Sequence, residues 1–194
     1  MQYSCVDCGL NGCRRPDGQH PAFCPAEGFD LEHEPWLGER LADPENRRVV
    51  EAAAASAGTA FDNKLSRLEE TVLFAKGIGA RKIGIAGCVS LASEVRNAGK
   101  ALRAAGFEVV GAICKMGTIT HADLDLHVGR KPDSVLCNPI YQAQVLNKEQ
   151  TDLNVLIGLC AGHDTLFIKH SEALCTVLAV KDFKYDHHSV LALR

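Results

Sequence analysis

The chain has 194 residues, of which 46% are hydrophobic and 23% are charged, and its net charge at pH 7 is −3. This length suits one α/β domain with a small appendage, and the small net charge excludes recruitment of nucleic acid or an anionic membrane by bulk charge. We find neither an apolar run of membrane-spanning length nor a signal-peptide core, so we expect a cytoplasmic protein.

Nine cysteines are an unusual number for such a chain. Reducing compartments keep thiols free, so cysteine-rich chains there more often bind metal or carry out thiol chemistry than form disulfides. The odd number also argues against a complete disulfide framework. We therefore interpret the cysteines as candidate metal ligands or reactive thiols.

The first predicted unit, residues 1–28, is rich in Cys, Gly and Pro and shows little periodicity. A two-residue gap between cysteines lets both thiolates of one turn reach one ion, and four thiolates satisfy a tetrahedral zinc or one iron–sulfur cluster. His20 is an alternative to one of the thiols. A segment this small cannot bury its own core, so a bound metal would supply much of its folding energy. The predicted metal ligands are Cys5, Cys8, Cys13 and Cys24.

Residues 29–80 are predicted to form a helical linker that packs on the core. Asp43-Pro44-Glu45 is typical of a helix start, with a capping acid, a proline at the first helical position and a second acid in the first turn. Ser66 and Glu69 have the spacing of a capping box and predict a further helix, which Gly77 ends.

From Lys82 onward, apolar runs alternate with helical segments, which predicts an α/β domain over residues 81–194. Continuous apolar strands imply an open parallel sheet covered on both faces, with Rossmann-like or flavodoxin-like layering. Ser90 is predicted to cap the first helix of this domain, and Asn138 a later one. We expect about five strands, at residues 83–86, 107–113, 134–136, 153–159 and 175–180.

Four of these strands end at a cysteine. The C-terminal ends of strands in an open parallel sheet face one crevice, where ligands bind, and a helix N-terminus lowers the pKa of a nearby thiol. A single cysteine at such a place is more often a small buried hydrophobe, but the recurrence favours a shared thiolate centre. The predicted members are Cys88, Cys114, Cys137 and Cys160. Cys175 lies at the opposite end of its strand, and we interpret it as a core residue.

Polar residues near the same strand ends are further candidates for this centre. His163 and Asp164 begin the helix after Cys160, Asp182 closes the last strand, and His187 lies in the loop beyond it. Asp164 fits helix capping equally well. We interpret the other nearby histidines as surface residues: His121, His127, His170 and His188.

Several blocks of the sequence resemble a family of cysteine-rich bacterial and archaeal proteins, known only as a domain of unknown function predicted to bind metal. The resemblance covers essentially the whole chain and implies metal binding without specifying a reaction. It implies that Cys88, Cys114 and His187 belong to the family pattern. Gly87, Cys175 and His188 depart from it. The matching blocks are Asp7-Cys8-Gly9, Cys13, Cys24-Pro25, Cys137-Asn138-Pro139-Ile140, Gln142-Ala143, Leu146-Asn147, Thr151-Asp152-Leu153-Asn154, Gly158-Leu159-Cys160, Gly162-His163-Asp164 and Val180-Lys181-Asp182.

Two functions of different kinds follow from these patterns. The first is a soluble metal-binding protein that holds zinc or an iron–sulfur cluster at both cysteine groups and serves redox chemistry, electron transfer or metal handling with a partner that the sequence does not identify. The alternative is a thiol enzyme with Cys160 as the nucleophile, His163 or another histidine as the base, and Asp164 nearby. That mechanism does not need three further strand-end cysteines, so we prefer the metal-binding function.

Nucleotide chemistry is not predicted. The turn after the first strand, residues 84–88, lacks the G-x-G-x-x-G pattern, and the chain has no P-loop sequence. A zinc-ribbon interaction module without chemistry of its own is a further alternative.

Overall fold

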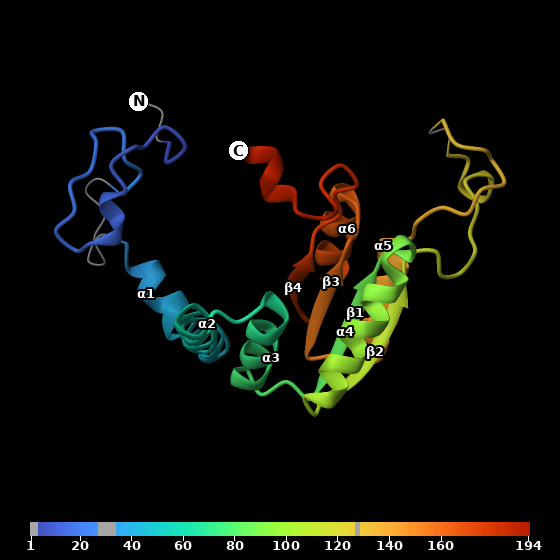
Figure 1. The fold of residues 1–194 in the computed structure, drawn as a ribbon, viewed down its shortest axis with the longest axis horizontal. Coiled ribbons are helices and arrows are strands. Elements are labelled where there is room, and N and C mark those ends of the chain that lie inside the picture. Colours follow the sequence, from blue (N-terminus) through green and yellow to red (C-terminus); the bar gives the residue numbers. More distant parts are fainter. Residues whose placement is uncertain (1–3, 27–33, 127–128) are drawn as a thin grey trace. The chain divides into compact units, whose positions relative to one another are not determined.

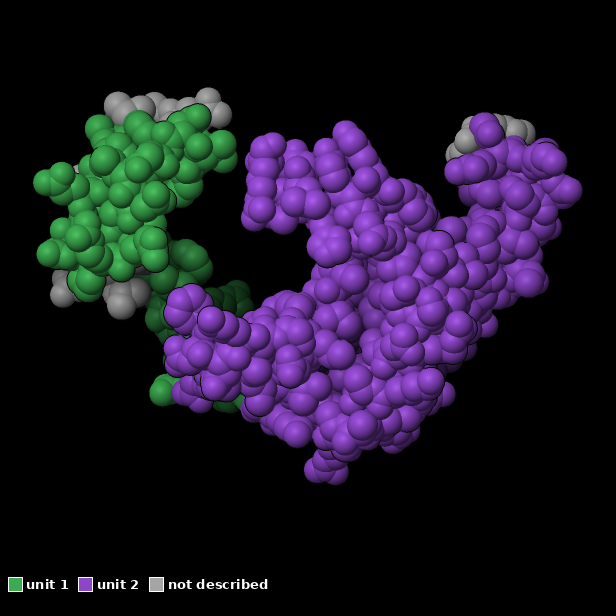
Figure 2. Space-filling view, viewed as in Figure 1, with its two compact units in different colours: residues 1–50 green, residues 51–194 purple. Residues whose placement is uncertain are grey.

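The computed structural model describes residues 4–26, 34–126 and 129–194 (Figure 1). The chain divides into two compact units, residues 1–50 and 51–194, and the boundary falls inside one long helix (Figure 2). No helix within the described ranges has the length and apolar character needed to cross a membrane. In chain order the main elements are α1 (Pro35–Ala42), α2 (Pro44–Asn63), α3 (Arg67–Gly77), β1 (Lys82–Gly87), α4 (Ala92–Ala104), β2 (Glu108–Ile113), α5 (Pro139–Lys148), β3 (Leu153–Ile157), α6 (Ala161–His170) and β4 (Leu174–Ala179).

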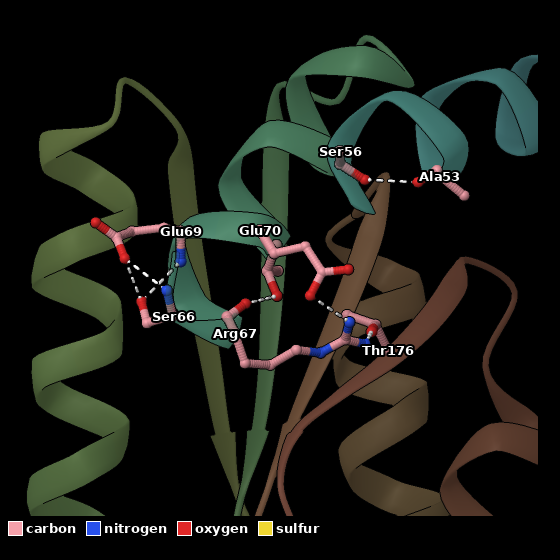
Figure 3. Close-up of polar contacts among 8 residues, drawn as sticks. Ala53, Ser56, Ser66, Arg67, Glu69, Glu70 and Thr176 are labelled. Atoms are coloured by element: carbon pink, nitrogen blue, oxygen red, sulfur yellow. Dashed lines mark hydrogen bonds and ion pairs between the residues drawn. The ribbon is translucent and has the colours of Figure 1, made fainter. Parts of the chain in front are cut away.

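Capping side chains begin the helices as the sequence predicts. The Ser66 hydroxyl accepts the N–H of Glu69 at 3.3 Å, and the Glu69 carboxylate accepts the N–H of Ser66 at 2.8 Å, which completes the capping box of α3 (Figure 3). At the start of α2, the Asp43 carboxylate accepts the N–H groups of Glu45 and Asn46. Both predicted helix starts are confirmed.

The sheet consists of four parallel strands in the order β2-β1-β3-β4. This is the beginning of the flavodoxin-like order, in which the chain reverses its direction of winding between β1 and β3. Helix α4 lies over one face of the sheet, and α5 and α6 lie over the other (Figure 1). The predicted parallel α/β architecture is confirmed, with four strands in the described residues where about five were expected.

The missing strand is the one predicted at residues 134–136. Val135 instead forms an isolated antiparallel bridge with Thr120, within the long connection between β2 and α5. Pro132 and Pro139 lie close on either side, and proline cannot donate to a strand ladder. The three residues 134–136, with a proline close to each end, are too few to form a strand that extends the sheet.

Strand β3 is the centre of the core, because both of its faces are covered and all five of its residues are buried. Apolar side chains from the covering helices fill the space around it, each contributing about 1.5–3 kcal/mol by burial. The fully buried members include Leu102 of α4, Leu146 of α5 and Phe167 of α6.

Helix α3 is tied to the edge strand β4. The Arg67 guanidinium donates to the Thr176 hydroxyl at 3.0 Å and pairs with the Glu70 carboxylate at 3.0 Å (Figure 3). Because Glu70 is three residues along the same helix, it orients the Arg67 side chain toward the strand.

Gly87, the last residue of β1, allows α4 to approach the strand closely. A Cβ atom on Gly87 would lie 2.3 Å from Cγ2 of Val95. The room beside Cys88 that this glycine provides is therefore occupied by a helix side chain.

We predict that Gly87→Ala lowers the free energy of unfolding by about 1–3 kcal/mol, because Val95 must move to admit the methyl group. Gly99→Ala in α4 is the matched control. Its Cβ would have no neighbour closer than 3.6 Å, and alanine favours a helix over glycine by up to about 1 kcal/mol. Urea denaturation followed by circular dichroism measures both. Equal midpoints for the two variants would contradict this packing.

Candidate thiolate site at the strand ends

Three cysteines lie at the C-terminal edge of the sheet. Cys88 directly follows β1, Cys114 directly follows β2, and Cys160 is the N-cap residue of α6, just beyond β3. The Cys88 N–H donates to the Ile157 carbonyl, and the Cys114 N–H donates to the Gly87 carbonyl, both at 3.0 Å. The three strand ends therefore stay hydrogen-bonded to one another where the thiols begin.

Lys181, two residues beyond β4, connects two of these thiols. Its ammonium nitrogen lies 2.7 Å from the sulfur of Cys88 and 3.5 Å from the sulfur of Cys160. Burial alone raises the pKa of Cys88, but hydrogen bonds from Lys181 and Ser90, together with the positive charge, bring it below the ordinary value. Burial lowers the pKa of Lys181, whereas its contacts with the two sulfurs raise it, and the net shift is upward. This pairing favours a thiolate–ammonium pair.

Ser90 contacts the Cys88 sulfur and does not cap the next helix. The N-cap residue of α4 is Leu91, which makes no side-chain cap hydrogen bond, so the predicted cap at Ser90 is wrong. A short 3-10 turn over Val89–Leu91 shifts the helix start past Ser90. The Ser90 hydroxyl instead lies 3.0 Å from the Cys88 sulfur.

Cys114 and Cys137 form the other half of the site. The Asn138 N–H donates to the Cys114 carbonyl at 2.7 Å, which places the residue after Cys137 beside β2. Cys114 is only 1% exposed, and burial raises its pKa to about 12, with further contributions from the neighbouring thiols of Cys137 and Cys88. The Val89 N–H points at its sulfur, 3.4 Å away.

Gln142 of α5 forms hydrogen bonds to the two strands that carry Cys88 and Cys114 at their ends. It is fully buried, and its amide nitrogen donates to the carbonyls of Gly87 at 3.1 Å and Ala112 at 2.7 Å. These carbonyls lie on two strands just before Cys88 and Cys114, so one side chain spaces the two thiol-bearing turns. Its amide oxygen is buried and makes no hydrogen bond within the described residues.

His163 and Asp164 begin α6 and are half-buried near Lys181. Burial, reinforced by the positive charge of Lys181, lowers the pKa of His163. Burial raises the pKa of Asp164, and Lys181 only partly offsets this. One oxygen of Asp164 is buried and makes no hydrogen bond in the described part of the chain. The donor toward Cys160 is Lys181 rather than the His163 ring.

Asp182 and His187 close a tight turn after β4. The Asp182 carboxylate accepts the N–H groups of Lys184 and Tyr185. The Asp182 N–H donates to Nδ1 of His187 at 3.0 Å, so Nε2 carries the proton of the neutral ring. In this arrangement neither nitrogen of His187 has a lone pair to offer a metal, and a ligand role would require this hydrogen bond to break.

The N-terminal cysteines lie in a segment of turns and one short 3-10 helix within residues 4–26, where Cys5 and Cys13 are exposed. The Cys8 N–H donates to the Cys5 carbonyl, and a 3-10 turn, Gly12–Arg14, contains Cys13. Gly12 and Gly18 touch backbone to backbone, since a Cβ on Gly18 would lie 1.9 Å from the Gly12 carbonyl oxygen. Cys24 is buried, with its sulfur 3.4 Å from Nδ1 of His20.

Neither the strand-end cysteines nor the N-terminal cysteines are arranged as a complete metal site among the residues that the structure describes. Within residues 4–26, 34–126 and 129–194, no three Cys, His, Asp or Glu side chains stand together as a metal-binding group. Of the histidines interpreted as surface residues, His127 lies outside the described residues. His121 is half-buried and contacts Ser134, and His188 is exposed. Cys175, which points at the Ala173 carbonyl, takes no part in the strand-end contacts.

Lys181 and Gln142 also belong to this edge, although the sequence predicted no role in the site for either residue. Lys181 follows an apolar strand in the same way as the cysteines do, and this signal could have identified it. Gln142 lies four residues after Asn138, one helical turn into α5, and Asn138 caps that helix by accepting the Tyr141 N–H at 3.0 Å.

The fold and the site define a cysteine-rich α/β protein with thiols gathered at a topological switch point. The chain belongs to the DUF1847 family, described as a protein of unknown function, whose match covers residues 27–178. It is also similar to an uncharacterized protein of Methanocaldococcus jannaschii, with 38% identity over 159 residues that cover 80% of each chain. No solved structure matches the chain.

We predict that Lys181→Met slows the reaction of Cys88 with a small thiol reagent at pH 7 by about tenfold, because a hydrogen bond to a charged group contributes about 1.5–3 kcal/mol. Lys181→Arg keeps the charge and preserves most of the rate. Mass spectrometry of the Cys88 peptide after timed treatment with methyl methanethiosulfonate measures this. Cys175 is the internal control, and we expect it to react at the same rate in the wild-type chain and in both variants. An unchanged Cys88 rate in Lys181→Met would show that the ammonium does not stabilise the thiolate.

Proposed function

We propose that the protein binds a soft metal centre, zinc or an iron–sulfur cluster, at the strand-end thiols, and a second one at the N-terminal cysteines. The main support is the position of four cysteines at the C-terminal edge of one sheet. Cys160 and Cys88 share the Lys181 ammonium, and the neighbouring thiols of Cys137 and Cys88 raise the pKa of Cys114. Four thiolates select zinc or iron–sulfur centres over harder ions.

The surroundings of these sulfurs suit an anionic metal–thiolate centre. Lys181 supplies a positive charge, and the Val89 N–H and the Ser90 hydroxyl supply hydrogen bonds to sulfur. Such outer contacts orient thiolate ligands and tune a bound centre. The switch point between β1 and β3 is also where flavodoxin-like sheets bind ligands.

Metal binding at this edge requires the side chains to draw together. Cys114 is buried with a raised pKa, so it must lose its proton as it becomes a ligand. The hydrogen bonds between the strand ends hold the backbones of Cys88 and Cys114 in place, so we expect these side chains to approach a metal by rotation.

The N-terminal fold supports the second centre. The backbone contact of Gly12 with Gly18 bends the segment back on itself, and His20 beside Cys24 is an alternative fourth donor. The other ligands are Cys5, Cys8 and Cys13. We expect the two centres to serve electron transfer or metal handling in a reducing, cytoplasmic compartment.

The test is metal and sulfide analysis of the full chain purified without oxygen. We expect Cys160→Ala to lose the metal of the sheet edge, while Cys8→Ala loses only the N-terminal metal. Cys175→Ala is the matched control and keeps both, because its thiol lies outside the strand-end contacts. Full metal content in Cys160→Ala, with an unchanged circular dichroism spectrum, would remove this thiol from the proposed ligands.

A further inference from the structure

We propose that Cys160 and Cys88 also form a thiol–disulfide exchange pair that reacts with low-molecular-weight disulfides. This activity goes beyond metal binding and does not depend on it. The chemistry needs two thiols within reach of each other, one of them open to solvent.

The first observation is the short path between the two sulfurs. Lys181 Nζ lies 2.7 Å from the Cys88 sulfur and 3.5 Å from the Cys160 sulfur, so the two sulfurs are separated by no more than the sum of these distances. To form a disulfide, the two sulfurs must approach from this separation by rotation about the Cα–Cβ bonds. The Cys160 side chain makes no cap hydrogen bond to α6 that would hold it back.

The backbone places the two cysteines on neighbouring strand ends. Cys88 and Cys160 follow β1 and β3, which are adjacent parallel strands, and the Cys88 N–H donates to the Ile157 carbonyl. Because Gly87 pairs with Ile157, Cys160 lies two residues beyond the position opposite Cys88. Gly158, between β3 and Cys160, has a left-handed φ of 61° that bends the chain there.

The two thiols differ in exposure, which assigns their roles. Cys160 is only half-buried, whereas Cys88 is 5% exposed, with its sulfur 2.7 Å from Lys181 Nζ. An incoming disulfide therefore meets Cys160 first. Cys88 is the resolving thiol.

The reaction balances in two exchanges. The Cys160 thiol gives its proton to solvent, and its sulfur attacks the substrate disulfide RSSR, forming a Cys160–S–SR bond and releasing RS⁻. The Cys88 thiolate then attacks the Cys160 sulfur, forming the Cys88–Cys160 disulfide and releasing a second RS⁻. The two cysteines lose two electrons and RSSR gains them, and the two released RS⁻ take protons from solvent to give two RSH. The Lys181 ammonium stabilises the attacking thiolate in the second exchange.

The experiment uses the full chain, reduced, freed of metal with a chelator and then mixed with oxidised glutathione. After the remaining thiols are blocked with N-ethylmaleimide, mass spectrometry maps the disulfides. We expect a Cys88–Cys160 bond in the wild-type chain. Cys88→Ser should instead accumulate a glutathione adduct on Cys160. Cys160→Ser should lower the rate of glutathione release from this pair by about tenfold or more, because Cys88 is shielded from solvent.

Two further variants make the outcome specific. Cys175→Ser should form the Cys88–Cys160 bond at the wild-type rate, whereas Lys181→Met should slow its formation about tenfold. A persistent Cys160–glutathione adduct in the wild-type chain, or a Cys114–Cys137 bond formed in place of Cys88–Cys160, would overturn the proposal. Cys114→Ser separates the two proposals, because it should lower metal content yet still form the exchange disulfide.

Discussion

The ammonium of Lys181 between two sulfurs is the interaction on which the strand-end site depends. It lies 2.7 Å from the Cys88 sulfur and 3.5 Å from the Cys160 sulfur. A positive charge so close to a thiol favours the thiolate, and the pKa of Cys88 lies below its ordinary value. A metal centre and a resolving thiol both require a thiolate at this position.

The fold places these groups by its winding order. The chain reverses its winding between β1 and β3, and the turns that carry Cys88 and Cys160 follow these two strands. Parallel sheets bind ligands at such a switch point. Gly158 closes the turn after β3 tightly, since a Cβ there would lie 2.9 Å from the Leu91 side chain. Gln142 spans the ends of β1 and β2, so the Cys114 side of the site is held at a set spacing from the Cys88 side.

Local signals in the sequence predicted much of this architecture. The capping box at Ser66, the caps at Asp43 and Asn138, and the continuous apolar strands depend on short-range chemistry, and the structure confirms them. The strand predicted at residues 134–136 is wrong, because a segment of three residues with only two apolar side chains does not specify which strand it will pair with. Here that partner is Thr120 rather than the sheet.

The contacts within the site were beyond prediction from local pattern. The pairing of Lys181 with Cys88 joins residues 93 positions apart, and only the strand order makes them neighbours. In the sequence, Gln142 is likewise only one polar residue of a helix. Its hydrogen bonds to the ends of β1 and β2 depend on the way α5 packs against the sheet.

X-ray absorption spectroscopy identifies the atoms that bind a metal at the strand ends. The protein is purified without oxygen as a Cys5→Ser, Cys8→Ser variant, so that only the strand-end centre is retained. We expect a metal with four sulfur neighbours at about 2.3 Å, the Zn–S distance of a tetrahedral site, or a shell of similar sulfur content for an iron–sulfur cluster. A first shell made mainly of oxygen or nitrogen, or a folded protein without metal, would contradict a shared thiolate centre at this edge.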